Sequence, residues 1–542
     1  MVDILTSTGI LLDISPDAEF DLTIENPIFS DERISAPWST DIAFLPTLRN
    51  KRAFGYMGAL MSAPSVTELA ATIIVQGIHL ISGTLIYDGL SDGCLNYTFT
   101  SRDLSVDWAK KLYELPFLGD AENGIDYMRE VLAGDIDGIS APVIVNAALE
   151  SDADWNLDEA NIGRKYRNAA DMDEPAKGFI PAITAAKLMS HAGLSAEVSG
   201  DLRELFRTLS ILGTMWTNWL PWTKSGSYSL NLTESLPDIS LKDFISELCK
   251  MCCSAVFLHR GKIHIISYNT IASANPVVWD DRVSDSFEVE NSEGTGYSLS
   301  YRNSPENTGA EAVPEIEVSA LPEVFDHFDK TGAVPQYLSI IHKPSGDIYS
   351  IGFDRVAKPS DNKWQAGNYL SSKLTGFGKY ETGEASESED VSIGLTPAPC
   401  VPVKYSLSES ENDRYMKMAP LVSIPGVGAA RPSEAVVVLA ASGQATDNGY
   451  IVGSTAADVS IGLRLDPAFL FDRYHKSFAA MKNKDMSTIT IDVSLSVYEL
   501  AALKIWSKVS IYGRNYLLSK ISVRMTATSS GRLTASCELL SL

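Results

Sequence analysis

The sequence predicts a β-rich α+β protein built from several domains. Its 542 residues exceed the roughly 250–300 residues at which a single hydrophobic core stops growing. Short runs with period-two alternation recur near both ends of the chain, whereas helical periodicity is confined to a few segments. A hydrophobic content of 45% and a charged content of 21% are typical of globular proteins and argue against a disordered chain.

Strands dominate the first part of the chain. "FDLTIENPIFS" predicts a strand that stops at Asn26-Pro27, and "LNYTFTSRD" predicts another with alternating Leu95, Tyr97 and Phe99. Between them, "LPTLRNKRAFGY" is a basic connection with no regular period.

The longest apolar stretch of this part, "ATIIVQGIHLISGTLIYDG", contains two β-branched runs. Two breaks between the runs are open, Gln76-Gly77 or Ser82-Gly83. Asp88-Gly89 is expected to close the unit as a turn.

Residues 129–230 have mixed character. "FIPAITAAKLMSHAG" predicts a helix with Pro181 near its first turn and Gly193 as its stop. Its apolar stripe would consist of Ile183, Ala186, Leu188 and Met189.

The clearest local pattern is "SLKDFISELCKMCC". Ser240 is the expected N-cap, with Asp243 at the capping-box spacing. The apolar positions follow one helical face: Leu241, Phe244, Ile245, Leu248, Cys249 and Cys252. "AVFLHRGKIHIIS" then predicts a hairpin that turns at Arg260-Gly261, so a helix should pack on a hairpin.

Residues 301–459 are the least regular. The acidic segment 381–390, "ETGEASESED", is expected to be an exposed loop, and "AARPSEAVVVLAASGQ" returns to strand character. Near the end, "AFLFDRYHKSFAAMKN" predicts a helix, and "STITIDVSLSVYELAALKI" predicts a strand and a short helix. Three closing strands should turn near Gly513-Arg514 and Ser530-Gly531.

The formal net charge of −25 excludes general nucleic-acid binding, which needs Lys and Arg to neutralise phosphates. It also argues against docking on an anionic membrane. No apolar stretch reaches the roughly 20 residues of a transmembrane helix, and the first residues have no basic region typical of a signal peptide. Six cysteines do not make a disulfide scaffold, which favours synthesis in a reducing cytoplasm.

Three of the cysteines lie within "CKMCC", residues 249–253. Cys249 and Cys252 form one C-x2-C pair, but a structural zinc site needs a second pair. The two thiols also fall at the C-terminal end of a helix, where the dipole disfavours thiolate. We therefore expect Cys249 and Cys252 to be buried and unliganded, with Cys253 nearer the helix end; a metal or redox pair is the alternative.

Other candidate sites are weaker. Residues 152–159, "DADWNLDE", resemble the start of a calcium loop but have Leu157 where glycine is required; a solvated acidic loop is favoured over a cation site. His259 and His264 should lie on facing hairpin strands, with no carboxylate partner near. "IPGVGAARP" lacks the lysine of a phosphate loop. We predict no catalytic residue, no cofactor-binding residue, no metal ligand and no cofactor.

Two clusters could mark binding surfaces. The basic cluster 48–54, "LRNKRAF", could contact nucleic acid, but pairing with an acidic face of this fold or of a neighbouring chain is favoured. Trp216, Trp219 and Trp222 could form a sugar platform, although a buried pack between domains is favoured.

Five stretches in order resemble one family, the tail-hub or baseplate-hub proteins of tailed phages, especially those of Bacteroides-type gut bacteria. They begin with "ENPIFSDERISAPWSTDIAFLPTLRNKRAFGY" and "GIHLISGTLIY". "FIPAITAAKLMSHAGLSAEVSG" and "LPDISLKDFISELCKMCCSAVFLHRGKIHII" resemble the central units, and "SLSVYELAALKIWSKVSIYGRNYLLSKISV" with "ELLSL" resembles the end of the family. The poorest match is the region 300–460.

The resemblance implies a fold similar to the hub of contractile tails and of type VI secretion spikes, with two tail-tube-like β-barrel or split-barrel domains. Residues 1–128 would form the first barrel, and 231–300 with 460–542 the second. Residues 129–230 would be a mixed α/β domain and 301–459 an irregular, β-containing insertion.

The same resemblance implies a non-enzymatic virion protein, made in the host cytoplasm, that forms a homotrimeric ring. The ring would join tail tube and distal tail proteins to the spike or fibre proteins of the tip, and DNA would only pass through. It implies no stable membrane insertion. Two other classes stay open: a tail-associated cell-wall hydrolase, since two distant carboxylates leave no motif, and a carbohydrate-binding adhesin.

Overall fold

One large, mostly antiparallel sheet dominates the structure, a computed structural model that is β-rich with few helices. The described residues are 2–34, 36–56, 64–101, 106–116, 118, 137–140, 182–212, 233, 236–302, 379–382, 388–397, 467–528 and 531–542, with short strands between 337 and 441. Most of 301–459, the segment 152–159 and the three clustered tryptophans lie outside these residues.

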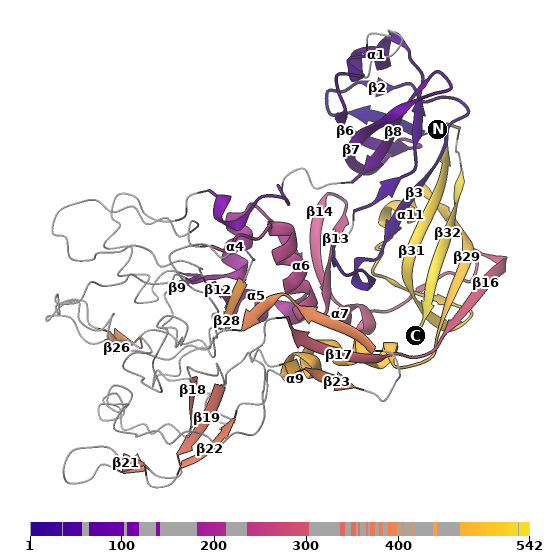
Figure 1. The fold of residues 1–542 in the computed structure, drawn as a ribbon. Helices are drawn as coiled ribbons and strands as arrows, with labels where there is room; N and C mark the ends of the chain where they lie inside the picture. Colours follow the sequence, from indigo (N-terminus) through magenta and orange to yellow (C-terminus); the bar gives the residue numbers. More distant parts are fainter. Residues whose placement is uncertain are drawn as a thin grey trace, which may run out of the picture.

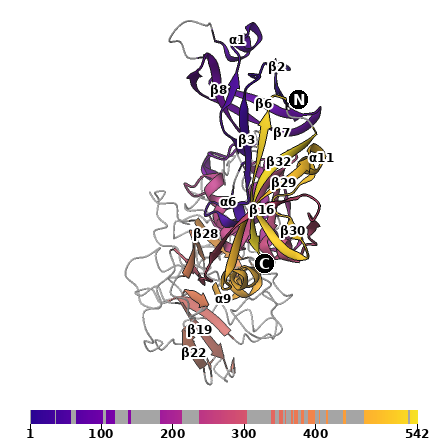
Figure 2. The ribbon, with the colours of Figure 1, turned by 90° about the vertical axis from the view of Figure 1, so that its right-hand side faces the viewer.

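The 14-stranded sheet has the order β16-β29-β32-β31-β3-β4-β8-β7-β6-β1-β2. The other three strands lie off this path: β5 pairs with β8, β30 with β31, and β15 with β30. Its first half consists of β1 (Val2–Thr6), β2 (Leu11–Leu12), β3 (Glu19–Glu25), β4 (Trp38–Ser39), β5 (Ile42–Phe44), β6 (Glu68–Val75), β7 (Ile78–Ser91) and β8 (Cys94–Thr100). Its second half consists of β15 (Val277–Val278), β16 (Val283–Ser292), β29 (Met486–Ser496), β30 (Lys508–Ile511), β31 (Arg514–Thr526) and β32 (Arg532–Ser541). The two halves lie one after the other within a single elongated sheet (Figures 1 and 2).

The first half confirms the expected strands and corrects one turn. β3 stops before Asn26, which caps a short 3-10 turn at Pro27–Phe29. Of the two open breaks, the chain turns at Gln76-Gly77. The expected turn at Asp88-Gly89 is wrong, because β7 absorbs these residues as an irregularity against β8 and turns at Asp92-Gly93.

The basic connection is a helix, α1 (Leu48–Phe54), where no regular period was expected. The side chain of Thr47 accepts the backbone N–H of Asn50 at its start, and Gly55 ends it with a φ of 62°. Only Asn50 and Phe54 are buried, so seven residues give too few apolar positions for a visible period.

The closing elements match the expectation. Helix α11 (Val497–Ala502) follows β29 and has a capping box between Ser496 and Glu499. The last three strands turn at Tyr512-Gly513 and beside Gly531. β3 pairs with β31 over seven residues, from Glu19↔Thr526 to Glu25↔Lys520, and this pairing joins the two halves.

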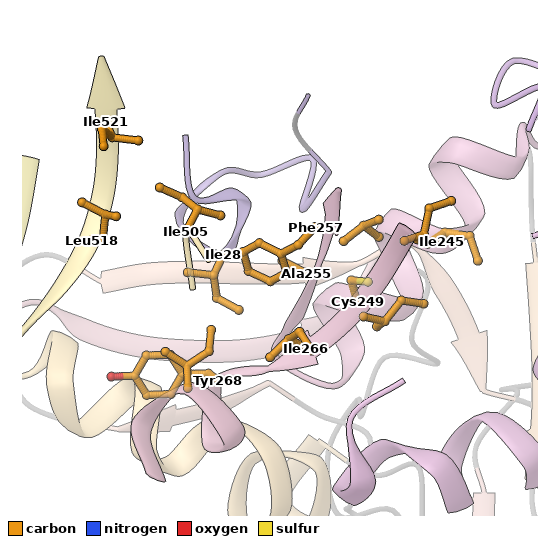
Figure 3. Close-up of a cluster of buried hydrophobic side chains, with 14 of the residues drawn as sticks. Ile28, Ile245, Cys249, Ala255, Phe257, Ile266, Tyr268, Ile505, Leu518 and Ile521 are labelled. Atoms are coloured by element: carbon orange, nitrogen blue, oxygen red, sulfur yellow. The ribbon is translucent and has the colours of Figure 1, made fainter. Parts of the chain in front are cut away.

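A helix packs on a hairpin, as expected. Helix α6 (Leu241–Met251) is capped by Ser240, whose side chain accepts from Asp243 N–H. It lies on β13 (Ser254–His259) and β14 (Lys262–Ser267), and β11 (Ala196–Val198) adds to β14 in parallel. Figure 3 shows the hairpin between the helix, with Ile245 and Cys249, and the large sheet, with Leu518 and Ile521.

The predicted helix over 179–193 is shorter than expected. Helix α4 (Ala185–His191) begins after Thr184, whose side chain accepts from Lys187 N–H. Ile183 belongs to β10 (Ala182–Thr184), which pairs with β9 (Ile139–Ser140) and β12 (Leu209–Leu212). Sheet pairing and the cap together move the helix start. The same five-stranded sheet includes β28 (Val437–Ala441) and β25 (Leu395–Pro397), and α5 (Arg203–Thr208) precedes β12.

The predicted C-terminal helix is present as α9 (Pro467–Leu470), a π-helical turn (Phe471–His475) and α10 (Lys476–Lys482). It packs on β17 (Gly296–Tyr301), which pairs with β23 (Tyr380–Thr382) and β24 (Ser388–Ile393). The acidic segment 381–390 was expected to be a loop, but its described ends are strand. Lys379 bonds both Glu381 and Asp390, which offsets the acidic charge.

Besides the 3-10 turns Leu112–Glu114 and Gly200–Leu202, the remaining described elements are short. They are α7 (Tyr268–Ser273), β18 (Tyr337–Ile341), β19 (Ile348–Phe353), β20 (Val356–Ala357), β21 (Gln365–Ala366), β22 (Tyr369–Lys373), β26 (Lys404–Tyr405) and β27 (Arg414–Tyr415).

Candidate assembly surfaces

The cysteine cluster is part of the core. Cys249, Cys252 and Cys253 are fully buried at the end of α6. Burial raises the pKa of Cys249 to about 11 and that of Cys253 to about 12, so both thiols hold their protons at neutral pH. The Cys252 thiol donates to Leu248 O at 3.1 Å. No group of three potential metal ligands occurs in the described ranges.

The hairpin histidines pack around an indole ring. His259 and His264 lie on the paired strands β13 and β14, with ring centroids 6.3 Å apart, and Trp506 lies 5.7 and 5.2 Å from them. Their expected lack of a carboxylate partner is wrong: Glu197 Oε2 lies 3.4 Å from His264 Nδ1. Glu197 arrives from β11, 67 positions away by numbering, so the hairpin sequence alone gave no signal of it.

A buried histidine, His475, has no signal in the sequence that marks it as part of a polar contact. His475 lies with Nδ1 2.7 Å from the Tyr297 hydroxyl and Nε2 3.0 Å from Met251 O. Because a carbonyl only accepts, Nε2 donates and Nδ1 accepts from Tyr297. Burial lowers the pKa of His475 to about 3, so the neutral ring ties α6, β17 and the π-helical turn together.

The basic cluster pairs within the fold for one of its residues. Arg49 Nη1 lies 2.9 Å from Asp13 Oδ1, and the Thr47 hydroxyl donates to Asp13 Oδ2 at 2.5 Å. Asn50 donates to Asp13 O and Leu45 O. These bonds fix α1 against β2. For Arg49 they fit the favoured interpretation, in which the cluster pairs with an acidic face of this fold or of a neighbouring chain.

The described residues form an apolar groove of about 650 Å³. We define it by three segments: residues 78–82 at the start of β7, residues 258–261 at the β13–β14 turn, and the side chains of Tyr498, Leu500, Leu503 and Trp506. β3 and β31 contribute its floor through Leu22, Ile24 and Ile521. The groove thus lies where the two halves of the sheet meet.

The charge at this groove contrasts with the whole chain. None of its lining residues is acidic. Arg260 Nε donates to Ala501 O at 3.0 Å, and Lys504 Nζ lies 5.7 Å from the Trp506 ring. Lys262 nearby is paired with Glu197, whereas Arg260 and Lys504 have no carboxylate within 4 Å in the described chain. The groove is therefore apolar inside and cationic at its rim.

The edge strand β16 is the second exposed surface. Its residues from Asp285 to Ser292 are all exposed, and the side chains of Phe287 and Val289 are 59% and 46% exposed. They face the same side as Ile491 and Ile489 of β29, so the apolar face of the sheet continues past the core. A register irregularity between Val283 and Phe287 bends the strand.

No family model matches this chain, and no curated protein matches it. Three solved structures are similar over nearly the whole length. The 43 kDa tail protein of prophage MuSo2 from Shewanella oneidensis is 8% identical with a TM-score of 0.35, covering 99% of this chain and 97% of that one.

The other two are a tail protein from Neisseria meningitidis MC58, 8% identical with a TM-score of 0.33, and the prophage tail protein gp18 from Listeria monocytogenes EGD-e, 6% identical with a TM-score of 0.30. Coverage is 100% of this chain and 96% of the Neisseria chain, and 99% of this chain and 94% of the Listeria chain. TM-scores this low do not establish a common fold, so these descriptions apply to those proteins alone.

Proposed function

We propose that this chain is a structural component of a phage tail, a hub that forms a ring between the tail tube and the tail tip. The observation that carries the proposal is the continuous sheet, whose two halves are joined by β3 and β31. Within the part of the chain that the structure describes, the sheet ends at the long edge strand β16 on one side and at the short β2 on the other. An exposed sheet edge presents unpaired backbone groups that a neighbouring chain can pair with.

The sequence resemblance and the charge support the same function. The stretches that resemble hub proteins include β4, β5, β7, the α6–hairpin unit and the β30–β31 segment, which are elements that build and flank the sheet. A net charge of −25 suits a ring through which DNA passes, since an acidic wall does not retain phosphates. No described helix is long and apolar enough to span a bilayer.

Three copies would place six sheet halves around one axis and so adapt a sixfold tube to a threefold tip. The partners would be tail tube and distal tail proteins on one side and spike or fibre proteins on the other. The protein would be made in the host cytoplasm and would function in the virion tail, without catalytic chemistry.

The test is cryo-electron microscopy of the purified full-length chain and of the particles that contain it. We expect a threefold ring with an axial channel wide enough for duplex DNA. A chain that stays monomeric at high concentration and occupies no ring in particles would contradict the hub. Two assays separate the hub from the alternatives. A hydrolase would clear peptidoglycan in a zymogram, and an adhesin would bind to a glycan array.

A further inference from the structure

We propose that the tip of the β13–β14 hairpin makes a pH-sensitive contact, which releases Trp506 when His259 and His264 gain protons in mild acid. We call the packing of these two histidines and Phe257 on Trp506 the hairpin contact. It joins the α6–hairpin unit to the segment between α11 and β30. The proposal concerns a contact within one chain, so it goes beyond the proposed ring and does not depend on it.

The hairpin contact consists of aromatic rings. The centroid of the Trp506 indole lies 4.9 Å from that of Phe257, 5.7 Å from that of His259 and 5.2 Å from that of His264. Both histidines are only partly exposed. A neutral imidazole packs in such a place at little cost, whereas an imidazolium loses hydration that the neighbouring rings do not replace.

One indole cannot compensate two added charges. A cation is attracted to the face of a tryptophan ring, but Lys504 Nζ already lies 5.7 Å from the centre of the Trp506 ring. Two imidazolium rings would compete with this ammonium group for the same indole, and like charges at such distances repel. Protonation therefore weakens the hairpin contact.

Burial is the main reason why His259 resists protonation. Burial lowers the pKa of His259 to about 4, and Arg260, His264 and Lys504 add to this effect. The ring is therefore neutral at neutral pH. Arg260 is fixed beside it, because its Nε donates to Ala501 O at 3.0 Å.

His264 has a carboxylate beside it, but cations compete for that group. Burial lowers the pKa of His264, Glu197 opposes this effect, and Lys504 and Lys262 reinforce it. Glu197 Oε2 lies 3.4 Å from His264 Nδ1, and Glu197 Oε1 lies 2.7 Å from Lys262 Nζ. Lys262 also lowers the pKa of Glu197, so this carboxylate is ionised and already paired when the histidines titrate.

The other titratable groups near the groove supply no further negative charge to the histidines. Glu499 of α11 is bound by Arg282 and Arg532, at 2.9 and 3.6 Å. Tyr498 and His79 also line the groove, but neither is negative in mild acid. Two added protons would therefore set five cationic side chains against Glu197: His259, His264, Arg260, Lys262 and Lys504.

The sign of the pH effect follows from the lowered pKa values. A histidine released from the contact returns towards its ordinary pKa of 6.5, so the open form binds more protons than the closed form. The contact is therefore intact above pH 6.5 and weakens as the pH falls towards about 4. Each histidine raises the ratio of open to closed form by up to about tenfold per pH unit.

The rest of the hairpin is held independently of the histidine side chains. Val256 N donates to Arg33 O at 2.8 Å, and β14 pairs with β11 over three residue pairs. Acid should therefore separate the tip from Trp506 while α6 and the large sheet stay folded. Residues 258–261 and Trp506 both line the apolar groove, so the separation would widen the groove and expose its lining.

Hydroxyl-radical footprinting of the full-length chain, read by mass spectrometry, tests the release at single side chains. Phe257 in the contact and Trp279 outside it are both 1% exposed, and Tyr512, 72% exposed, normalises the radical dose. Oxidation of Phe257 should rise at least about tenfold from pH 7 to pH 4.5, whereas Trp279 should stay protected. Exposure of both together would be general unfolding and would overturn the proposal, as would a Phe257 that stays protected at pH 4.5.

Substitution of the two histidines tests whether they cause the release. In the variant with His259→Gln and His264→Gln, the oxidation of Phe257 should agree within about twofold between pH 7 and pH 4.5. His79→Gln is the matched control, because His79 is an exposed histidine that lines the same groove, and it should keep the wild-type rise. A rise in the double variant as large as that of the wild type would contradict the proposal.

Glu197→Gln tests the charge balance with both histidines in place. Loss of the carboxylate should raise the pH at which Phe257 is half-oxidised by about 0.2–0.5, a small shift because exposed charges interact weakly. This variant decides the case if the double variant exposes Trp279 at pH 7 and so fails to fold. A midpoint that stays unchanged or falls would show that the histidines do not govern the hairpin contact.

Discussion

At the scale of single residues, His475 shows how a buried polar group fixes the core. Its two ring nitrogens join Tyr297 and Met251, which lie 178 and 224 positions away in the chain. The sequence around it predicts a helix correctly, but nothing local marks which helical residue will be buried among distant polar partners. Such partners follow from the fold and not from the pattern.

The pH dependence of stability should report this residue. Its pKa is about 3 when folded, against an ordinary value of 6.5, so the unfolded chain binds more protons between these values. The contribution of His475 to the free energy of unfolding is therefore fully present above pH 6.5. It is lost as the pH falls towards 3, by up to about 1.4 kcal/mol per pH unit. His475→Gln, which keeps a donor and an acceptor but does not titrate, should show a shallower loss in urea unfolding.

The free energy of unfolding is plotted against pH from 4 to 7 for the wild type and for His475→Gln. The difference between the two slopes is the result, because the other titrating groups contribute equally to both. His79→Gln, at an exposed histidine, is the control. Its slope of unfolding free energy against pH should lie closer to that of the wild type than the slope of His475→Gln does. Equal slopes for wild type and His475→Gln would contradict a neutral, buried His475.

The thiols give a second prediction at this scale. Burial raises the pKa of Cys537 to about 12, as it does for Cys253, and only the thiolate alkylates. In native protein at pH 8, Cys94 should react with iodoacetamide at least about 100-fold faster than the four buried thiols, as measured by mass spectrometry of peptides. Rapid labelling of Cys249 or Cys252 would show that the end of α6 opens.

At the scale of elements, the sequence predicted what local signals determine. The cap and apolar face of α6, the hairpin turn and the closing strands depend on neighbours within a few residues, and all are present. α1 was missed because its cap bonds and its contact with Asp13 replace an apolar stripe. The sequence predicted that the strand ends at Asp88-Gly89, because this dipeptide is typical of turns. In the structure β7 continues through it and pairs with β8 with a register shift.

Alanine substitution at two glycines of β7, Gly83 and Gly89, should change stability by very different amounts. A Cβ at Gly83 would lie 2.2 Å from Thr100 O and 2.6 Å from the Phe99 ring, whereas a Cβ at Gly89 would meet nothing within 4 Å. Gly83→Ala should therefore destabilise by about 1–3 kcal/mol through overpacking, and Gly89→Ala should be near neutral or slightly stabilising. Urea midpoints of both variants measure this; similar midpoints would contradict the close approach of β7 and β8 at Gly83.

At the scale of the whole molecule, long-range pairing decides the architecture. β3 near one terminus pairs with β31 near the other, and no turn or periodicity links segments so far apart. The resemblance predicted two barrel-like domains, but the hydrogen bonds that join the sheet halves become visible only in the structure. Asn26 reinforces this junction: its amide nitrogen donates to Leu518 O at 3.0 Å, and its side-chain oxygen accepts from Ile28 N.

Removal of the Asn26 side chain should therefore loosen both halves together. Asn26→Ala leaves buried backbone groups without partners, which costs about 1–3 kcal/mol, and hydrogen exchange by mass spectrometry should show faster exchange in β3 and β31 alike. Asp21→Ala, at a partly exposed position of β3 whose carboxylate lies 3.6 Å from Arg524, is the control, since solvent-accessible ion pairs contribute little. If β3 exchanged faster while β31 kept its protection, the halves would be independent units, and the continuous sheet that supports the ring would lose its main argument.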